Sequence, residues 1–281
     1  MEGAGLLVVR GGLPCNLAHA CRRDVEERHT RALVSNDAFA EIHDPTMRSE
    51  LMLELVGSVR PAVVAVLHRC RGTLTQTVGS DAELCELSAI SSEPGSLMQR
   101  EHSDTSPEAW IFDGSGSDED SDTDGGEADD TRACELYFSG ICRLVTIFVA
   151  LTDVAPNMGP TRVWPGTHTA AFHASMRHRS GALEAQPFID LELRQGDCVL
   201  MDSRLWHCGG ANRSDTRRTL LVISLLEAGL FPPFGTTYSM LDHMRGQHTL
   251  CELLDGACGG QAEAAEPLRE PGVPGSEREV S

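Results

Sequence analysis

The sequence predicts a mainly β fold with flanking helices, whose core is a double-stranded β-helix of the jelly-roll type. Three observations support this prediction. The chain of 281 residues is long enough for one large domain with a substantial core. Its first part carries two stretches with the apolar spacing of helices. From Leu84 onward, short apolar runs alternate with Gly, Pro, Ser and Asn, which is typical of a sandwich or barrel of short strands.

The N-terminal part should supply one strand and two helices. Residues 5–10 predict an opening strand, and residues 14–30 predict a helix with one apolar face. Residues 46–68 carry apolar residues at a spacing of four, which predicts a second helix that Pro61 kinks or breaks. Both helices are expected to pack on one face of a sheet and to take no part in chemistry.

Short apolar runs predict the remaining strands. A ring of such strands would enclose a rigid cavity whose mouth could hold a metal ion. The predicted strands are residues 84–90, 97–104, 136–151, 162–164, 188–193, 198–201 and 219–226.

Two segments interrupt or follow the predicted domain. Residues 113–130 contain nine acidic residues and no basic one, with Gly and Ser filling most other positions, which predicts a disordered insertion. Residues 259–281 are rich in Ala, Glu, Pro and Gly and predict a disordered tail. Residues 1–258 are therefore expected to form one domain.

The composition excludes several classes of protein. The net charge of −19 argues against a nucleic-acid or anionic-membrane partner, because phosphate binding requires a basic face. There is no apolar run of membrane-spanning length, no secretory signal and no C-terminal peroxisomal signal, so we expect an intracellular, cytoplasmic protein. The ten cysteines form no C-x-x-C motif and are expected to be reduced.

Four residues suggest an iron site. His102 and Asp104 are two residues apart, which on a strand places both side chains on one face. His207 follows the apolar run 198–201 and precedes a predicted turn. Two histidines and one carboxylate are the ligand set of non-haem Fe(II) oxygenases. Arg218 follows eleven residues after His207, and its planar guanidinium suits a bidentate bond to a carboxylate.

With these residues in place, the sequence resembles the phytanoyl-CoA dioxygenase family of Fe(II)/2-oxoglutarate-dependent oxygenases. The resemblance implies that His102, Asp104 and His207 bind Fe(II) and that Arg218 holds 2-oxoglutarate. It further implies that O2 is consumed and that a small organic or lipid-like substrate is hydroxylated with release of succinate and CO2. The resemblance covers about residues 5–228 and rests on residues 5–13, 99–104, 150–154, 157–160, 165–168 and 196–197, leading to His207 and Arg218.

Other residues near these motifs have two readings each. Arg217 competes with Arg218 for the carboxylate, and the family spacing favours Arg218. Gln99 could support the metal site or the co-substrate, or be a solvated strand residue. Phe148 could wall the cavity or be an ordinary core residue, and Trp110 could line the substrate mouth. Three histidines are expected to be solvated: His168, His173 and His178.

Several alternative functions compete with hydroxylation. One is a catalytically inactive binding or regulatory protein with the same fold, and another is a zinc or manganese protein that ignores 2-oxoglutarate. Relatives of the prolyl hydroxylases usually bind the distal carboxylate with lysine, and this chain has no lysine. Halogenases replace the metal carboxylate with a small residue, whereas Asp104 is present. An acidic insertion close to the cavity would disfavour highly anionic substrates such as acyl-CoA thioesters.

Overall fold

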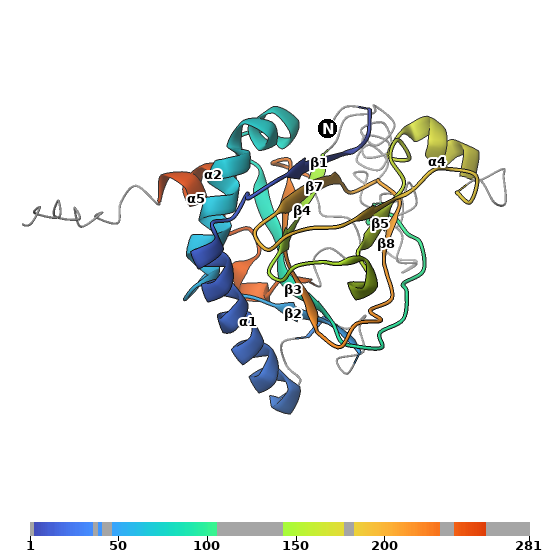
Figure 1. The fold of residues 1–281 in the computed structure, drawn as a ribbon. Coiled ribbons are helices and arrows are strands. Elements are labelled where there is room, and N and C mark those ends of the chain that lie inside the picture. Colours follow the sequence, from blue (N-terminus) through green and yellow to red (C-terminus); the bar gives the residue numbers. More distant parts are fainter. Residues whose placement is uncertain are drawn as a thin grey trace, which may run out of the picture.

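The computed structural model describes residues 3–35, 39–40, 47–105, 143–176, 183–230 and 239–256. Two antiparallel sheets face each other (Figure 1). The larger sheet consists, in spatial order, of β1 (Leu6–Val9), β7 (Cys198–Asp202), β4 (Leu144–Ala150), β9 (Arg218–Leu226), β3 (Glu83–Ser92) and β2 (Arg48–Met52). The smaller sheet consists of β6 (Ile189–Leu191), β5 (Thr161–Val163) and β8 (His207–Gly209). This is the double-stranded β-helix with flanking helices that the sequence predicts.

Helices cover the outer face of the larger sheet. The long helices α1 (Cys15–Ser35) and α2 (Val59–Val78) lie against it, together with the short α5 (Leu250–Asp255) (Figure 1). A further short helix, α4 (Ala170–Met176), lies near the smaller sheet, and two 3-10 turns, η2 (Pro156–Met158) and η4 (Asp242–Met244), complete the described elements. None of the described helices combines the length and the apolar character needed to cross a membrane.

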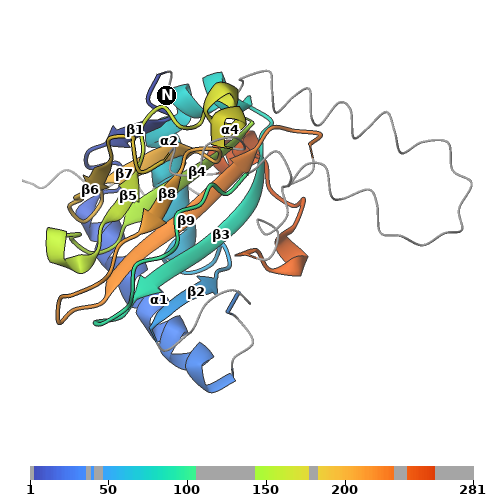
Figure 2. The ribbon, with the colours of Figure 1, turned by 90° about the vertical axis from the view of Figure 1, so that its right-hand side faces the viewer.

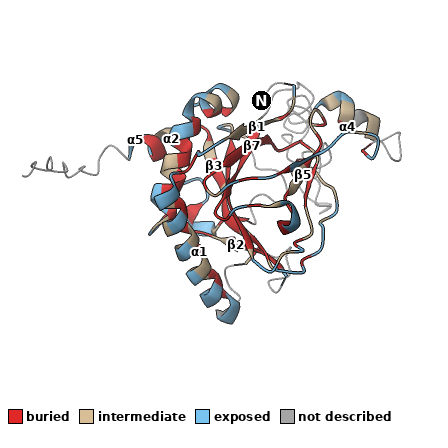
Figure 3. Cartoon of the chain, viewed as in Figure 1, coloured by how far each residue is buried: buried red, intermediate tan, exposed pale blue. Residues whose placement is uncertain are grey.

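The larger sheet is buried on both faces. Successive side chains of a strand point to opposite sides, so each strand contributes residues to both layers of packing. In β9 every residue is buried. Leu221, Ile223 and Leu225 pack into the cluster formed with α1 and α2, whereas Leu220 and Val222 pack into the cluster between the two sheets. Figure 3 shows this layer of buried strands between the helices and the smaller sheet. The outer face of the sheet therefore packs against the helices, and residues of the inner face can line a cavity.

Most of the predicted strands are confirmed. The opening strand and the runs at 84–90, 162–164, 188–193, 198–201 and 219–226 correspond to β1, β3, β5, β6, β7 and β9. The run at 136–151 contains β4, and its first residues lie outside the described part of the chain. The first helix is longer than expected and ends at Ser35 instead of residue 30.

The prediction of one helix over residues 46–68 is wrong. Its first part is strand β2, which pairs with the edge of β3, and the helix begins only at Val59 (Figure 2). The spacing of four was coincidental: Leu51 points from β2 into the helix-side core, while Glu50 points the other way into a cavity. Pro61 does not break the helix because it lies in the first turn, where a backbone N–H has no helical partner to lose.

Two predictions near the site also need correction. Residues 97–104 do not form a strand, since only His102 makes a β-bridge, with His207, and Leu97 is 81% exposed. The predicted turn directly after His207 is instead the short strand β8. The acidic residues 113–130, the tail 259–281, Trp110 and His178 lie outside the described residues.

Candidate metal centre and its cavity

The segment 97–105, here called the bridging segment, runs along β8 and brings His102 opposite His207. The two histidines exchange backbone hydrogen bonds, from His102 N–H to the His207 carbonyl (3.0 Å) and from His207 N–H to the His102 carbonyl (2.8 Å). Further bonds fix both ends of the segment: Gln99 N–H donates to the Gly209 carbonyl (2.9 Å) and Thr105 N–H to the Ser203 carbonyl (3.0 Å). The bridging segment is therefore held in a fixed register against β8, although the two do not form a continuous ladder of hydrogen bonds.

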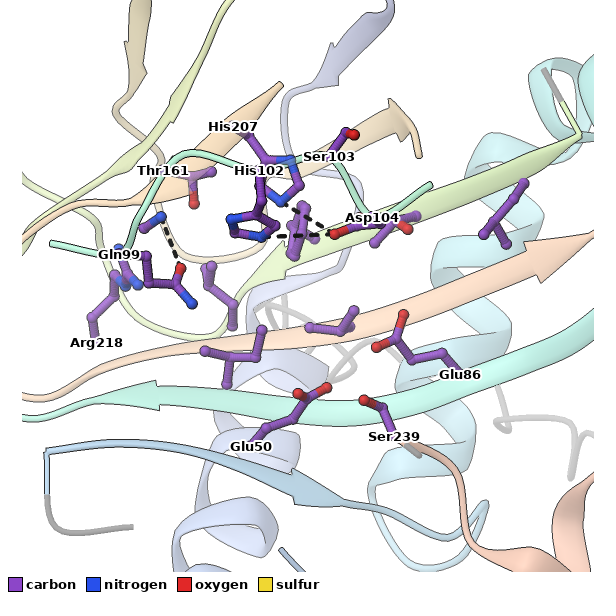
Figure 4. A pocket seen from close by; sticks show the side chains of 17 residues that line it. Glu50, Glu86, Gln99, His102, Ser103, Asp104, Thr161, His207, Arg218 and Ser239 are labelled. Carbon is purple, nitrogen blue, oxygen red and sulfur yellow. Dashed lines mark hydrogen bonds and ion pairs between the residues drawn. The ribbon is translucent and has the colours of Figure 1, made fainter. Parts of the chain in front are cut away.

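This register brings the three predicted metal ligands together. Asp104 Oδ1 lies 3.8 Å from His102 Nε2 and 3.5 Å from His207 Nε2 (Figure 4). One ligand atom from each of the three side chains lies within 4.8 Å of the others. His207 is buried, whereas His102 and Asp104 are partly exposed. The arrangement leaves space for a cation between the three side chains.

Backbone carbonyls orient both imidazoles. His102 Nδ1 lies 2.9 Å from the Arg100 carbonyl, and His207 Nδ1 lies 2.9 Å from the Leu205 carbonyl. A carbonyl can only accept, so each Nδ1 carries the proton and each Nε2 presents its lone pair toward Asp104. Burial lowers the pKa of His207 below its ordinary value, although Asp104 opposes the shift. The neutral form that can bind a metal is therefore favoured.

Arg218 lies buried at one end of the cavity. Its Nη2 donates to Ser92 Oγ (2.9 Å), its Nη1 donates to the Gly159 carbonyl, and its Nε has no partner among the described residues. No carboxylate in the described part of the chain forms an ion pair with it. Burial, with the nearby guanidinium of Arg48, lowers the pKa of Arg218 to about 9. A bound carboxylate would supply the missing acceptor and stabilise the charged form.

The competing residue Arg217 points away from the cavity. Its Nε lies 2.5 Å from Glu93 Oε1, so its charge is already paired. Alternation along β9 thus turns only Arg218 inward, as the family spacing predicts.

Gln99 and Phe148 both line the cavity. Gln99 Oε1 accepts a hydrogen bond from the Gly209 N–H (2.9 Å), which ties the bridging segment to β8. Phe148 lies on β4 with its ring centroid 6.3 Å from that of His207. The solvated reading of Gln99 does not fit this position. Phe148 is both buried and a cavity wall, so its two readings coincide.

His173, expected to be solvated, is instead buried on α4, with its Nε2 2.8 Å from the Arg204 carbonyl. His168 is half-buried, and burial lowers its pKa. Neither lines the cavity. The seven cysteines in the described part of the chain are all free thiols, as expected.

The cavity has a volume of about 400 Å³, and the charge of its lining changes from one end to the other. Arg218 and Gln99 lie at one end, and Glu86 and Ser239 at the other, with Glu50 on the wall facing the histidines (Figure 4). Apolar side chains separate the two ends on the sheet floor: Ile90, Phe148, Leu220 and Val222.

Sequence reasoning missed the acidic end of the cavity. Glu50 lies in a stretch predicted to be helical, and a helix there gives no indication that the Glu50 side chain points into a cavity. Glu86 carried a usable signal: within the predicted strand 84–90, Glu86 and Ser88 alternate with Leu87 and Ala89, which marks one polar face on an otherwise apolar strand.

Parts of the chain are similar in sequence to known dioxygenases. The chain is 30% identical over 88 residues to the dioxygenase FUM3 of Gibberella moniliformis, covering 31% of this chain and 27% of that protein. It is 29% identical over 103 residues to the dioxygenase easH of Epichloe festucae var. lolii, covering 36% and 51%. A family model described as phytanoyl-CoA dioxygenase (PhyH) matches residues 126–220. Within residues 126–220, the chain is similar to the phytanoyl-CoA dioxygenase family.

The match to the phytanoyl-CoA dioxygenase model is confined to part of the chain. It includes Phe148, His207 and Arg218, whereas His102 and Asp104 precede it. The chain spans about a quarter to a half of the length of the curated relatives it matches. The structure brings the residues inside and outside the matched region into one cavity.

Solved structures show the same fold at low identity. AviO1 of Streptomyces viridochromogenes Tue57 superposes with a TM-score of 0.57 at 16% identity, covering 83% of this chain and 94% of that one. HygX of Streptomyces hygroscopicus, solved with nickel, 2-oxoglutarate and hygromycin B, gives 0.53 at 16% identity, covering 82% and 86%. The epimerase SnoN, described as non-heme and alpha ketoglutarate dependent, gives 0.54 at 19% identity, covering 81% and 79%.

Proposed function

We propose that this chain is an Fe(II)- and 2-oxoglutarate-dependent dioxygenase that hydroxylates a small organic molecule. The observation that carries the proposal is the convergence of His102, Asp104 and His207 on one point of a cavity that also contains the unpaired guanidinium of Arg218. The named dioxygenases among the relatives support it, as do neighbouring structures solved with Fe3+ or nickel and 2-oxoglutarate.

The donor set fits Fe(II). Two neutral imidazoles and one carboxylate are the ligands that non-haem Fe(II) oxygenases use, and they leave coordination positions open. His102 and His207 would bind through Nε2, each kept in the required tautomer by its backbone carbonyl, and the Asp104 carboxylate would offset one charge of the ion. Bound iron would supply the activation of O2.

Arg218 would receive the distal carboxylate of 2-oxoglutarate. Its Nε already lacks an acceptor, so binding requires little rearrangement of the protein. Phe148 would wall the cavity beside the metal, and Gln99 would keep the bridging segment against β8. In the overall reaction one oxygen atom of O2 enters succinate and the other enters the hydroxylated product, while 2-oxoglutarate loses CO2.

Anaerobic titration with Fe(II) and then 2-oxoglutarate tests the proposal. We expect the visible metal-to-ligand charge-transfer band in the wild-type protein and its loss in His207→Ala. Loss of a charge-assisted hydrogen bond costs about 1.5 to 3 kcal/mol, so Arg218→Ala should raise the 2-oxoglutarate concentration at half-saturation by about 10- to 150-fold. Arg217→Ala, next to it in sequence but paired with Glu93, is the matched control and should behave as wild type.

Two outcomes would contradict the proposal. No band in metal-loaded wild-type protein would favour a non-catalytic binding or regulatory protein. Equal effects of Arg217→Ala and Arg218→Ala would remove the assignment of the co-substrate site.

A further inference from the structure

Two carboxyl groups line the cavity at the end away from Arg218. Glu50 lies on β2 and Glu86 on β3, and both side chains point into the cavity from the wall opposite His102 and His207 (Figure 4). Glu50 is 3% exposed, whereas Glu86 is partly exposed because it borders the open space. Their strands are adjacent, with Glu50 opposite Ile90 in the register, and both side chains line the same cavity.

The two carboxyl groups lie close enough to interact, and this interaction favours the protonated form of Glu86. Hydroxyl groups complete the arrangement: Ser88 Oγ donates to Glu50 Oε1 (2.8 Å), and Ser224 Oγ donates to Glu86 Oε2. Burial raises the pKa of Glu86 well above its usual range, and Glu50 and Asp104 raise it further. Among the described residues, the charged groups that act on Glu86 are thus the carboxyl groups of Glu50 and Asp104.

Other features identify the cavity as a binding site independently of these two carboxyl groups. The three metal-ligating atoms converge on it, and Arg218, 1% exposed and with an unpartnered Nε, lies at its other end. The inner face of the sheet therefore runs from a basic end to an acidic end, with apolar side chains between. A dicarboxylate fits only the basic end, which leaves the acidic end for the second molecule in the cavity.

We propose that the cavity takes a substrate carrying a primary ammonium group, which Glu50 and Glu86 bind together. This inference rests on the proposed function in calling the bound molecule a substrate, but binding of the ammonium group needs no metal. An ammonium ion offers three hydrogen-bond donors and no acceptor. It can donate to both carboxyl groups, and its apolar stem then lies along Ile90 and Val222. A carboxylate in this position would face the carboxyl groups of Glu50 and Glu86.

Calorimetric titration of the metal-free protein tests the proposal with defined probes. Butylamine, hexylamine and benzylamine are each compared with the alcohol and the carboxylic acid of the same carbon skeleton. At least one amine should bind about tenfold or more tightly than its alcohol, and the acids should not bind at this end, which is tested in the presence of saturating 2-oxoglutarate.

Variants assign the preference to the two carboxyls. Glu50→Gln and Glu86→Gln should each weaken amine binding by about tenfold or more while changing alcohol binding little. Glu83→Gln, on the same strand but outside the cavity, is the matched control. The inference is overturned if no amine binds at millimolar concentration, if an acid binds as tightly as its amine, or if the preference survives in the double Glu50→Gln, Glu86→Gln variant.

The inference and the proposed function can fail separately. Amine binding without a charge-transfer band would leave the ammonium site and remove the oxygenase. A band without amine binding would leave the oxygenase and remove the ammonium site.

Discussion

Arg218 and Glu86 show how burial acts on single residues of this cavity. Both lie on the inner face of the larger sheet, and removal from water disfavours the charged form of each. The pKa of Arg218 is therefore lowered and that of Glu86 raised. A ligand of the opposite sign would stabilise the charged form of each side chain. Both consequently lower the stability of the ligand-free protein.

Glu86→Gln should stabilise the metal-free protein at neutral pH. The folded state holds Glu86 protonated while the unfolded chain releases the proton above its pKa of about 4.5, so ionisation favours unfolding. Glutamine keeps the same shape and can donate to Glu50 and accept from Ser224. We therefore expect a higher free energy of unfolding in the variant, measured with urea.

The pH dependence of this gain provides its control. As the pH falls toward 4.5, the unfolded chain also becomes protonated at Glu86, so the difference between variant and wild type should disappear. Glu83→Gln should show neither the gain nor its loss. A destabilised Glu86→Gln protein would mean that Glu86 is ionised in the folded state.

At the scale of elements, the metal centre depends on how closely the bridging segment approaches β8. Gly209 makes this approach possible: a Cβ atom there would lie 2.2 Å from Arg48 Nη1 and 2.6 Å from Gln99 Oε1. Arg48 in turn donates to the carbonyls of Leu97 (2.9 Å) and Gly210 (3.0 Å), holding the segment to the strand. Arg48 and Gln99 thus position the histidine ligands from outside the metal site.

Gly209→Ala should therefore impair the metal centre. The added methyl group displaces Arg48 and Gln99, so the bridging segment shifts and His102 moves relative to His207. Disturbance of groups that orient metal ligands typically costs about 10- to 100-fold in affinity, and we expect an effect of this size in a metal titration. Gly72→Ala, on α2 with no atom within 4 Å of the new Cβ, should leave metal affinity unchanged. Equal affinities in the two variants would contradict the prediction.

The contrast between predicted and missed elements has a physical basis. Strands β4, β7 and β9 are buried on both faces and appear in the sequence as nearly continuous apolar runs. Strand β2 was missed because a pairing distant in sequence overrode a coincidental spacing, and β8 because three residues are too few to show a period.

The candidate site divides in the same way. His102, Asp104, His207 and Arg218 could be proposed from their order and spacing, because these residue types together suit one metal chemistry. Glu50 and Glu86 could not be paired in advance. Their contact depends on the register of β2 against β3, which no local pattern specifies.

At the scale of the whole molecule, buried histidines link stability to pH. Burial lowers the pKa values of His29, His168 and His207, whereas each would titrate near 6.5 in the unfolded chain. The unfolded state then binds more protons below pH 6.5, so the free energy of unfolding should fall as the pH drops through this range.

Urea denaturation of metal-free protein between about pH 5.5 and about pH 7.5 checks this expectation. The Glu86→Gln background is preferable, because wild-type Glu86 contributes a slope of opposite sign. His29→Gln should reduce the loss at the acidic end, since His29 is buried against Ser49 (2.7 Å). His19→Gln, on the exposed side of α1, should not. Stability that does not change across this range would contradict the prediction.

The nine residues of β9 contribute to two different parts of the molecule. Its alternate positions belong either to the helix-side core, as Leu221 and Ile223 do, or to the cavity, as Arg218 and Val222 do. Substitutions of the first kind alter folding, and substitutions of the second kind alter what the cavity accepts. Descendants of this chain can therefore change their substrate at every second position of one strand while inheriting the packing behind it unchanged.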